Sequence, residues 1–326
     1  MKSEILRLLK ESDDYISGQQ MCDRFHVSRT AVWKAIEQLK KEGYEIEAVR
    51  NRGYRLLESP DIMSEAEIRS LMDTEWAGKN IVYFDEIDST NNRAKELGEK
   101  DGAHGTLFVA DRQVAGKGRR GRVWESPKGV SIYMTILLRP DLIPTKAPML
   151  TLVMAQSVAE GIREVTGMET GIKWPNDIVM NKKKVCGILT EMSTEIDYIN
   201  YVVIGVGINV NQKVFDEELK EKATSLMIET GAPVKRSALI AAVMKHFEKN
   251  YALFMEKGDL SGLQESYNEM LVNRGKEVRI LEPGNEYNAH AYGINETGEL
   301  IVRTQKGEEK HIFAGEVSVR GIYGYV

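Results

Sequence analysis

Cysteine is scarce in this sequence. Only two occur among 326 residues, Cys22 and Cys186, far apart along the chain. Neither belongs to a CxxC pair or to a Cys/His cluster, which argues against a zinc site. Two distant cysteines also argue against a disulfide framework, and this favours a reducing, cytoplasmic location.

Long apolar runs and an excess of positive charge are also lacking. No run approaches the roughly 20 apolar residues that a membrane helix needs, and the first residues, MKSEILRLLKESDDY, are too charged for a signal peptide. The net charge is −5, so any site for an anion must be a local concentration of positive charge. The length allows two or three domains.

Residues 1–60 predict a winged helix-turn-helix. Apolar residues at helical spacing predict a first helix, and the pattern S-x-x-Q at Ser17–Gln20 predicts the start of a second. Ser28 is expected to cap a third helix, which Gly43 ends. The alternating stretch YEIEAVRNRGYRLLE then predicts a hairpin with a basic tip.

Positive charge in this region concentrates where a recognition helix and a wing would meet phosphates, although residues 1–60 are nearly neutral as a whole. The apolar stripe Val32, Ile36 and Leu39 leaves the other face of the third helix for DNA. The alternative is a generic three-helix bundle with a solvated polar face. The expected DNA contacts are Ser28, Arg29, Thr30, Trp33, Lys34, Arg50 and Arg52.

The rest of the chain predicts two further domains, which makes the fold class α+β. A linker through Glu58–Asp61 precedes a mixed α/β region at 61–271, and short strands with polar turns at 272–326 predict a small β-barrel. Ser237 is expected to cap a long helix of the middle region. Its expected strands include IVYFDEI, TLFVAD, SIYMTILL, 177–180, 184–192 and 201–210.

The stretch GKGRRGRVW, residues 116–124, carries four cations and three glycines. It lacks the G-x-x-x-x-G-K-[ST] spacing of a P-loop, and it does not open a helix as a dinucleotide-binding fingerprint does. The glycines favour a mobile loop that becomes ordered on an anion, since arginine forks suit phosphate and carboxylate oxygens. Trp124 either covers a flat base or anchors the loop in the core.

Three later stretches carry weaker signals. In GIKWPND, Pro175 fixes a turn on which a Lys, an Asn and an Asp converge, or which merely buries a Trp. In KKKVCGI, Lys184 adjoins the apolar strand and is the lysine expected to point inward. In GVGINVN, residues 205–211, glycines allow a ligand to approach a strand closely.

Taken together and in this order, these stretches resemble one family. Ser89-Thr90-Asn91, Gln113 with GKGRRGRVW, KWPND, KVCGILTE and GVGINV are similar to a biotin–protein ligase. With the N-terminal winged helix, the whole chain resembles the bifunctional bacterial ligase that also represses the biotin operon. The resemblance implies a class II synthetase-like central domain and an SH3-like C-terminal barrel.

The resemblance also implies the site, residue by residue. Implied contacts to biotin come from Ser89, Thr90, Asn91, Gln113, Lys117, Gly118, Arg119 and Lys184. Implied contacts to ATP or the adenylate come from Arg119, Arg122, Trp124, Asn176, Lys184, Asn209, Glu316 and Arg320. Implied catalytic roles belong to Lys184, Arg119 and Asp177. The family often has Arg where this chain has Lys117, and lysine keeps the charge without the bidentate fork.

The implied reaction uses biotin, ATP and Mg²⁺ to form biotinyl-5′-adenylate, and then transfers biotin to a lysine of a biotin carboxyl carrier protein domain. The implied partners are operator DNA and a second copy of the chain when the adenylate is bound. The strand Tyr201–Val206 lies either at a sheet edge, where it could pair in such a dimer, or in the core. Three alternatives stay open: a lipoate–protein ligase, a repressor that senses a ligand without catalysis, and a ligase that does not bind DNA.

Overall fold

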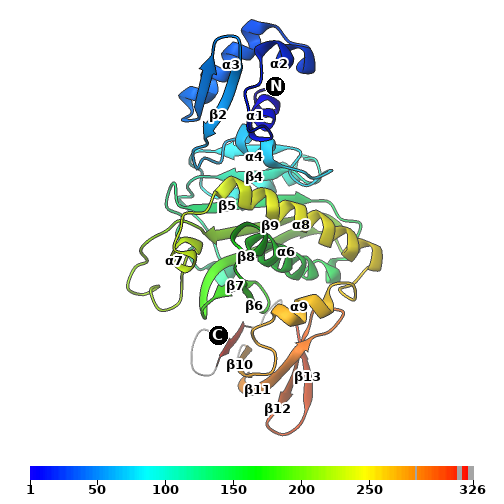
Figure 1. Cartoon of the computed structure of the whole chain (residues 1–326). Helices are drawn as coiled ribbons and strands as arrows, with labels where there is room; N and C mark the ends of the chain where they lie inside the picture. Colours follow the sequence, from blue (N-terminus) through cyan, green and yellow to red (C-terminus); the bar gives the residue numbers. More distant parts are fainter. Residues whose placement is uncertain (283–284, 314–317, 322–326) are drawn as a thin grey trace. The chain divides into compact units, whose positions relative to one another are not determined.

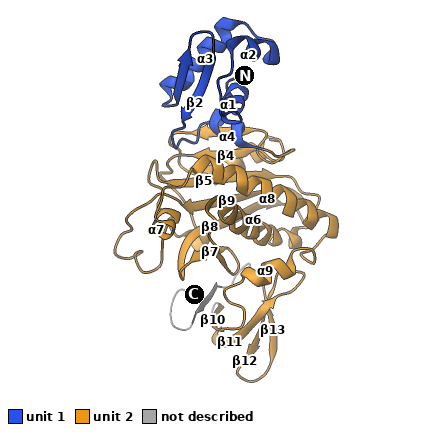
Figure 2. Ribbon diagram, in the orientation of Figure 1, with its two compact units in different colours: residues 1–72 blue, residues 73–326 orange. Residues whose placement is uncertain are grey.

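The computed structural model describes residues 1–282, 285–313 and 318–321, with backbone alone for the last of these ranges (Figure 1). The chain divides into two compact units, Met1–Met72 and Asp73–Val326 (Figure 2). Each unit is described separately below. Within the described residues, no helix is both long and apolar enough to cross a membrane.

Unit 1 is a winged helix-turn-helix followed by one further helix. The predicted caps are confirmed: Ser17 and Gln20 form a complete capping box, and Ser28 accepts a hydrogen bond from the backbone N–H of Ala31 at 3.2 Å. The turn between the second and third helices passes through His26, whose φ is 53°. The elements are α1 (Lys2–Lys10), α2 (Gly18–Phe25), α3 (Arg29–Lys41), β1 (Glu45–Val49), β2 (Gly53–Glu58) and α4 (Glu65–Leu71).

The core of unit 1 lies between α1, α3 and the hairpin. Val32, Ile36 and Leu39 are buried, as the helical spacing predicts. Ile16 exchanges backbone hydrogen bonds of 2.9 Å with Tyr54 of β2 and so forms an isolated β-bridge with the wing.

Helix α4 is fastened to α1 by polar contacts. Arg7 donates to the backbone oxygens of Ser70 at 3.2 Å and of Met72 at 2.5 Å, at the C-terminal end of α4. Lys10 lies 2.6 Å from the carboxylate of Glu67, which is almost fully buried. A cation at the last carbonyl groups of a helix satisfies acceptors that the helix itself leaves open.

Unit 2 contains a seven-stranded mixed sheet with the order β3-β4-β5-β9-β8-β7-β6. Its strands are β3 (Ile81–Phe84), β4 (Leu107–Ala110), β5 (Ser131–Leu138), β6 (Gly171–Lys173), β7 (Asp177–Met180), β8 (Lys183–Thr194) and β9 (Ile199–Asn209). Strand β9 pairs with β5 on one side and with β8 on the other. The possibility that Tyr201–Val206 forms a sheet edge is therefore wrong, and the core alternative is correct.

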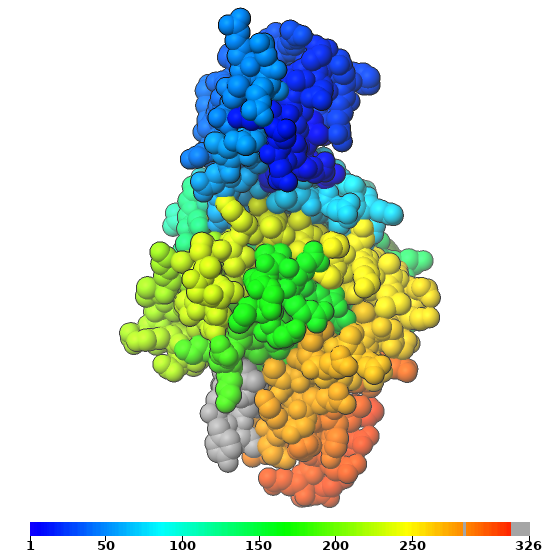
Figure 3. All heavy atoms as spheres, viewed as in Figure 1, coloured from blue at the N-terminus to red at the C-terminus, as the bar shows by residue number. Residues whose placement is uncertain are grey.

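Helices cover both faces of this sheet. Helix α5 (Thr90–Gly98) buries Ala94 against Phe108, Leu137 and Val203 on one face. Thr190 of β8 points to the opposite face, where its hydroxyl lies 2.8 Å from that of Thr151 in α6 (Met149–Thr166). In the space-filling view α6, in green, lies beside α8 (Arg236–Lys257), in yellow (Figure 3).

The start of α8 differs from the prediction. Lys235, not Ser237, occupies the capping position, and Ser237 is buried inside the first turn. The cause is Arg236, which is also buried and whose guanidinium lies 2.6 Å from the carboxylate of Asp111. This buried ion pair draws Arg236 into the helix, so the helix begins one residue before the serine.

The end of unit 2 is a five-stranded antiparallel sheet with the order β13-β12-β11-β10-β14, which confirms a small all-β C-terminal part. Trp174, in the turn before β7, donates from its indole nitrogen to the backbone oxygen of Gly298 at 3.0 Å and so ties this part to the larger sheet. The remaining elements are η1 (Arg119–Gly121), η2 (Pro144–Lys146), α7 (Leu226–Thr230), α9 (Gln264–Met270), β10 (Glu277–Glu282), β11 (Asn285–Ile294), β12 (Leu300–Thr304), β13 (Glu309–Ile312) and β14 (Ser318–Gly321).

Candidate functional site

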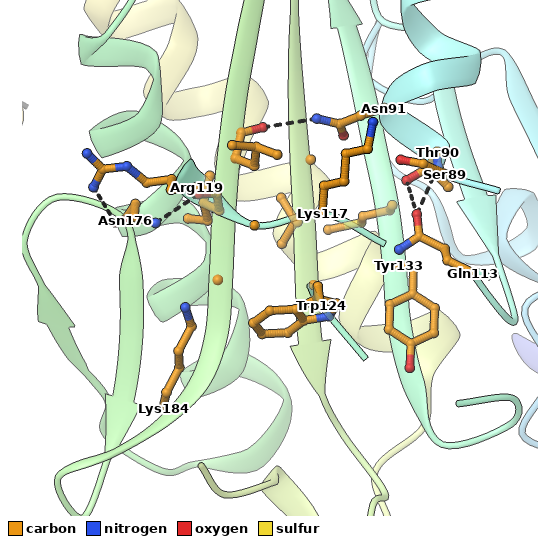
Figure 4. Close-up of a pocket in the computed structure, with 18 residues that line it drawn as sticks. Ser89, Thr90, Asn91, Gln113, Lys117, Arg119, Trp124, Tyr133, Asn176 and Lys184 are labelled. Carbon is orange, nitrogen blue, oxygen red and sulfur yellow. Dashed lines mark hydrogen bonds between the residues drawn. The ribbon is translucent and has the colours of Figure 1, made fainter. Parts of the chain in front are cut away.

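A pocket lies on the face of the sheet that α5 covers (Figure 4). Ten of the predicted site residues line it: Ser89, Thr90, Asn91, Gln113, Lys117, Gly118, Arg119, Trp124, Asn176 and Lys184. These residues come from five separate stretches of sequence. The central strands β5, β8 and β9 supply the floor, and the loop 116–124 supplies one wall.

One end of the pocket carries the uncharged hydrogen-bonding groups of Ser89, Thr90, Asn91 and Gln113, and the side chain of Lys117 extends beside them toward Asn91 (Figure 4). The amide oxygen of Gln113 accepts from the backbone N–H of Thr90 at 2.8 Å, and the Thr90 hydroxyl oxygen lies 3.0 Å from the same atom (Figure 4). The amide nitrogen of Gln113 donates to the hydroxyl of Ser126 at 3.2 Å. Since a backbone N–H can only donate, this pairing fixes which way the Gln113 amide faces.

The loop 116–124 is folded into a small hairpin. Lys117 and Val123 form an antiparallel β-bridge through their backbones, and the backbone N–H of Gly118 donates to the backbone oxygen of Arg122 at 2.7 Å. Arg120 takes the left-handed conformation at the tip, with φ 58°. Arg119 points back to the sheet and donates to the amide oxygen of Asn176 at 2.9 Å (Figure 4). Burial lowers the pKa of Arg119 from its usual value.

Trp124 lies flat against glycines of the central strands. A Cβ atom on Gly207 would lie 2.6 Å from the indole nitrogen, and one on Gly187 would lie 2.9 Å from the indole ring. The glycines therefore let the ring approach the sheet closely. Among the residues that the structure describes, the buried indole nitrogen has no hydrogen-bond partner, and such a donor is suited to an oxygen of a ligand.

Lys184 reaches the charged end of the pocket from β8. Its amine lies 2.5 Å from the carboxylate of Asp177 and 5.1 Å from the centre of the Trp124 ring. The neighbouring Lys183 instead donates to the backbone oxygen of Lys220 at 2.9 Å, so Lys184 is the lysine of this run that lines the pocket. Arg119 and Lys184 give this end two cations, which suits an anionic ligand.

Cys186 does not add a nucleophile to this end. The thiol is fully buried, and burial raises its pKa. A thiol of raised pKa stays protonated and unreactive at neutral pH.

The structure places other predicted residues outside the pocket. Asn209 is buried and donates to the backbone oxygen of Thr224 at 3.1 Å, and Arg122 is exposed. Arg320 lies on β14 opposite Arg279, and only its backbone is described. Glu316, also predicted to contact the nucleotide, lies outside the described residues.

Sequence patterns missed several pocket residues. Tyr133 and Met134 of β5, and Ile188 and Leu189 of β8, also line it. The stretch SIYMTILL predicts a strand, but every residue of β5 is buried. Without a polar face there is no signal in the sequence to separate the residues that meet a ligand from those that meet the core.

In unit 1, the residues predicted to contact DNA are exposed on α3 and at the tip of the wing. Trp33 is 53% exposed, and Thr30, Lys34 and Arg50 are exposed as well. Ser28 caps the helix, and Arg29 donates to the side chain of Gln19 at 2.8 Å.

The wing residue Arg52 is held in place by its neighbours. Its guanidinium carbon lies 4.1 Å from the centre of the Tyr15 ring, and a terminal nitrogen lies 3.3 Å from the carboxylate of Asp14. Both contacts are at the surface, where an ion pair contributes little to stability. A phosphate can therefore compete for this arginine at small cost.

Comparison with known proteins matches this architecture from end to end. The model of the Biotin/lipoate A/B protein ligase family matches residues 83–209, an HTH domain matches 2–55 and a Biotin protein ligase C terminal domain matches 275–320. A biotin protein ligase from Aquifex aeolicus, solved in complex with biotin and ATP, has a TM-score of 0.66 at 34% identity and covers 74% of this chain and 99% of its own. The predicted α+β fold class is confirmed.

Relatives match this chain over nearly its whole length. The chain is 43% identical to the bifunctional ligase/repressor BirA of Bacillus spizizenii over 324 residues, which are 98% of this chain and 98% of that protein. BirA of Escherichia coli is 28% identical over 96% of this chain and 95% of its own length. The chain therefore belongs to the BirA family of bifunctional ligase/repressors, as a biotin–protein ligase that carries an HTH domain.

Proposed function

We propose that this chain attaches biotin to a lysine of a biotin carboxyl carrier protein domain in two steps, and that it represses biotin genes. In the first step an oxygen of the biotin carboxylate attacks the α-phosphate of ATP, and pyrophosphate leaves. In the second step the lysine amine attacks the carbonyl carbon of the biotinyl-5′-adenylate, AMP leaves, and the amine loses its proton. The pocket with one uncharged end and one cationic end is the observation that carries this proposal.

The uncharged end is proposed to hold the ureido ring of biotin. A ureido group has N–H donors and a carbonyl acceptor, and the hydroxyl and amide groups of Ser89, Thr90, Asn91 and Gln113 complement both. A small number of precisely placed polar groups of this kind fixes the orientation of a ligand and gives a pocket its specificity. The dithiolane ring of lipoate offers no such donors, so this end favours biotin over the lipoate alternative.

The cationic end is proposed to bring two anions together. Biotin's carboxylate and the α-phosphate repel each other, and fixed cations placed between them offset that repulsion as charge builds up in the transition state. Lys184 is proposed to bridge the two groups. Lys117, Gly118 and Arg119 are proposed to close over biotin and the phosphate, which would keep the adenylate from water.

The remaining nucleotide contacts are proposed from the family resemblance. Trp124 would meet the adenine, and Arg122, Asn176, Asn209, Glu316 and Arg320 would meet other parts of ATP or the adenylate. Asp177 would accept a hydrogen bond from the incoming lysine amine, once Lys184 has turned to its ligand. Mg²⁺ is proposed to enter bound to the phosphates of ATP; among the described residues, no group of three or more His, Cys, Asp or Glu is placed to hold a metal.

The repressor activity is proposed to use α3 and the wing on operator DNA, through Ser28, Arg29, Thr30, Trp33, Lys34, Arg50 and Arg52. A homodimer formed when the adenylate is bound would place two such units on one operator. We propose domain boundaries at 1–60, 61–271 and 272–326, and a cytoplasmic location in keeping with two free, buried cysteines.

Incubation with biotin, ATP and a carrier domain tests the ligase proposal. The expected result is a carrier whose mass rises by one biotinyl group, with pyrophosphate released even before the carrier is added. Lipoate in place of biotin should give neither product. Pyrophosphate release with lipoate but not with biotin would contradict the proposal, and a gel shift with the control region of biotin genes tests the repressor part.

A further inference from the structure

The side-chain amide of Asn91 rests in a notch across three neighbouring strands. Thr135 of β5, Gly205 of β9 and Leu189 of β8 stand opposite one another in the register of the sheet. A Cβ atom on Gly205 would lie only 2.1 Å from the amide oxygen of Asn91. Because glycine has no Cβ, the middle strand leaves the space in which the amide lies.

Both polar atoms of this amide are bonded inside the protein. The Thr135 hydroxyl donates to the amide oxygen of Asn91 at 2.6 Å, and the amide nitrogen donates to the carboxylate of Glu191 at 2.8 Å. A carboxylate only accepts hydrogen bonds, so the nitrogen must face Glu191 and the oxygen must face Thr135. The orientation of the Asn91 amide is therefore fixed from both sides.

Glu191 is held as an anion at its end of the notch. Burial acts to raise the pKa of Glu191, but the hydrogen bonds from Lys95 and Asn91 outweigh burial, and the pKa lies below its usual value. The amine of Lys95, on α5, lies 2.8 Å from the second carboxylate oxygen. Helix α5 is thus tied to β8 both through Asn91 and through Lys95.

Thr135 also touches the residue that is proposed to meet biotin directly. Its hydroxyl oxygen is fully buried and lies 2.8 Å from that of Thr90. The Thr135 hydroxyl has one hydrogen, which it gives to Asn91, so in this contact the Thr90 hydroxyl donates and Thr135 accepts. The backbone N–H of Thr90 in turn donates to the amide oxygen of Gln113 at 2.8 Å. A chain of hydrogen bonds therefore runs from Glu191 through Asn91, Thr135 and Thr90 to Gln113, from the sheet to the uncharged end of the pocket.

We propose that Asn91 is a positioning residue rather than a contact to the ligand, and that Thr135, Gly205 and Glu191 hold it. The inference rests on the proposed function and replaces one part of it, the direct contact between the Asn91 amide and the ureido ring that the family resemblance implies. In this role Asn91 fastens the N-terminal end of α5 to the sheet. Thr90 and Gln113 then meet the ureido group with their donors and acceptors already arranged, which lowers the cost of ordering them on binding.

Calorimetric titration of the full chain with biotin tests this role. The wild type must first bind biotin, and if it does not, the proposed function fails rather than the present inference. Thr135→Val keeps the shape but leaves the Asn91 oxygen unpaired, so the Kd for biotin should rise about tenfold or more. Thr135→Ser keeps the hydroxyl and should restore the wild-type Kd, and the KM for ATP should stay within about twofold in both.

A double-mutant cycle tests whether Asn91 and Thr135 act on biotin binding as one unit. If Asn91 acts through this network, Asn91→Ala combined with Thr135→Val should bind biotin no more weakly than Asn91→Ala alone. A wild-type Kd for biotin in Thr135→Val would overturn the proposal. So would a double variant whose Kd rises by the product of the two single increases. If Thr135→Val fails to fold, Gly205→Ala is the second variant. The added Cβ displaces the Asn91 amide, so the Kd for biotin should rise equally. Wild-type affinity in Gly205→Ala would also overturn the proposal.

Discussion

The guanidinium of Arg119 and the side-chain amide of Asn176 are joined by a hydrogen bond of 2.9 Å. Arg119 belongs to the loop 116–124, whereas Asn176 belongs to the turn before β7 and donates from its own nitrogen to the backbone oxygen of Ile188 at 3.0 Å. The loop is therefore linked through Asn176 to the strand that carries Lys184. Loop position and pocket geometry are coupled through this pair.

Arg119→Gly should release adenylate into solution, because the substitution removes both a cation and the link from the loop to Asn176. The measurement is biotinylation of bystander proteins mixed with the enzyme, which should rise at least about tenfold. Arg120→Gly is the matched control, since it removes a cation from the same loop at a left-handed position that glycine accepts. Equal leakage from the two variants would count against the role of Arg119 in closure.

Lys184→Ala should lower biotin-dependent release of pyrophosphate by about 100-fold or more, as expected when a charged group is removed from the place where transition-state charge develops. Biotin binding should weaken less, because the uncharged end of the pocket is untouched. Lys183→Ala is the control, since its amine bonds to Lys220 outside the pocket. Adenylation at the wild-type rate in Lys184→Ala would remove this lysine from the mechanism.

Trp174→Phe should lower the free energy of unfolding by about 1–3 kcal/mol, since the buried backbone oxygen of Gly298 loses the indole donor. Trp174 is 2% exposed, so water does not replace the lost hydrogen bond. Urea denaturation monitored by circular dichroism measures the change. A variant as stable as the wild type would show that this contact between the two sheets contributes nothing.

Stability should depend on pH through His246 on α8. A hydrogen bond with Glu160 raises the pKa of His246; burial opposes the rise, and Glu164 adds to it. The stability from charged His246 is thus fully present below the unfolded-state pKa of about 6.5 and is lost as pH rises through the raised folded pKa.

The two glutamates set the lower limit of this pH window. Burial acts to raise the pKa of Glu160, but its hydrogen bonds with His246, Gln156 and Asn250 leave it lowered. Its contribution is lost as pH falls below about 4.3. The stability advantage of the wild type over His246→Gln should therefore be largest between about pH 4.3 and 6.5 and decline above, measured by urea denaturation; an advantage that grows above pH 7 would refute this origin.

Arg50→Ala should weaken binding to duplex DNA at every sequence and reduce the slope of log affinity against log salt by about 1, as expected for one lost phosphate contact. Fluorescence anisotropy across a salt series measures both. Arg69→Ala is a control from the same unit, since that arginine pairs with Glu65 on α4. An unchanged salt slope in Arg50→Ala would show that this wing residue does not contact a DNA phosphate.

Local interactions were the part of this fold that sequence could predict. Ser17, Gln20 and Ser28 cap helices through bonds that span three residues, so a short pattern carries the whole signal. The buried stripe on α3 follows in the same way from helical spacing. The site residues were predicted from the resemblance of several motifs to one family, and ten of them line one pocket.

Long-range pairing was the part that sequence could not give. Whether Tyr201–Val206 is an edge or a central strand depends on β5 and β8, which lie about 70 and 15 residues away and leave no mark on its own pattern. The first turn of α8 likewise depends on Asp111, which directly follows β4 and pairs with Arg236. The sequence does not predict the hydrogen bond between Thr135 and Asn91, because nothing within SIYMTILL marks this hydroxyl as a partner of a distant amide.

The contacts between α1 and α4 bear on how the DNA-binding part should be produced by itself. A fragment cut at residue 60 would keep α3 and the wing but would leave Arg7 without its carbonyl partners and Lys10 without Glu67. It would also expose the apolar side of α1 that α4 covers, where Ile68 is fully buried. A fragment that runs to residue 72 carries its own covering helix and is the better candidate for solution work on the operator.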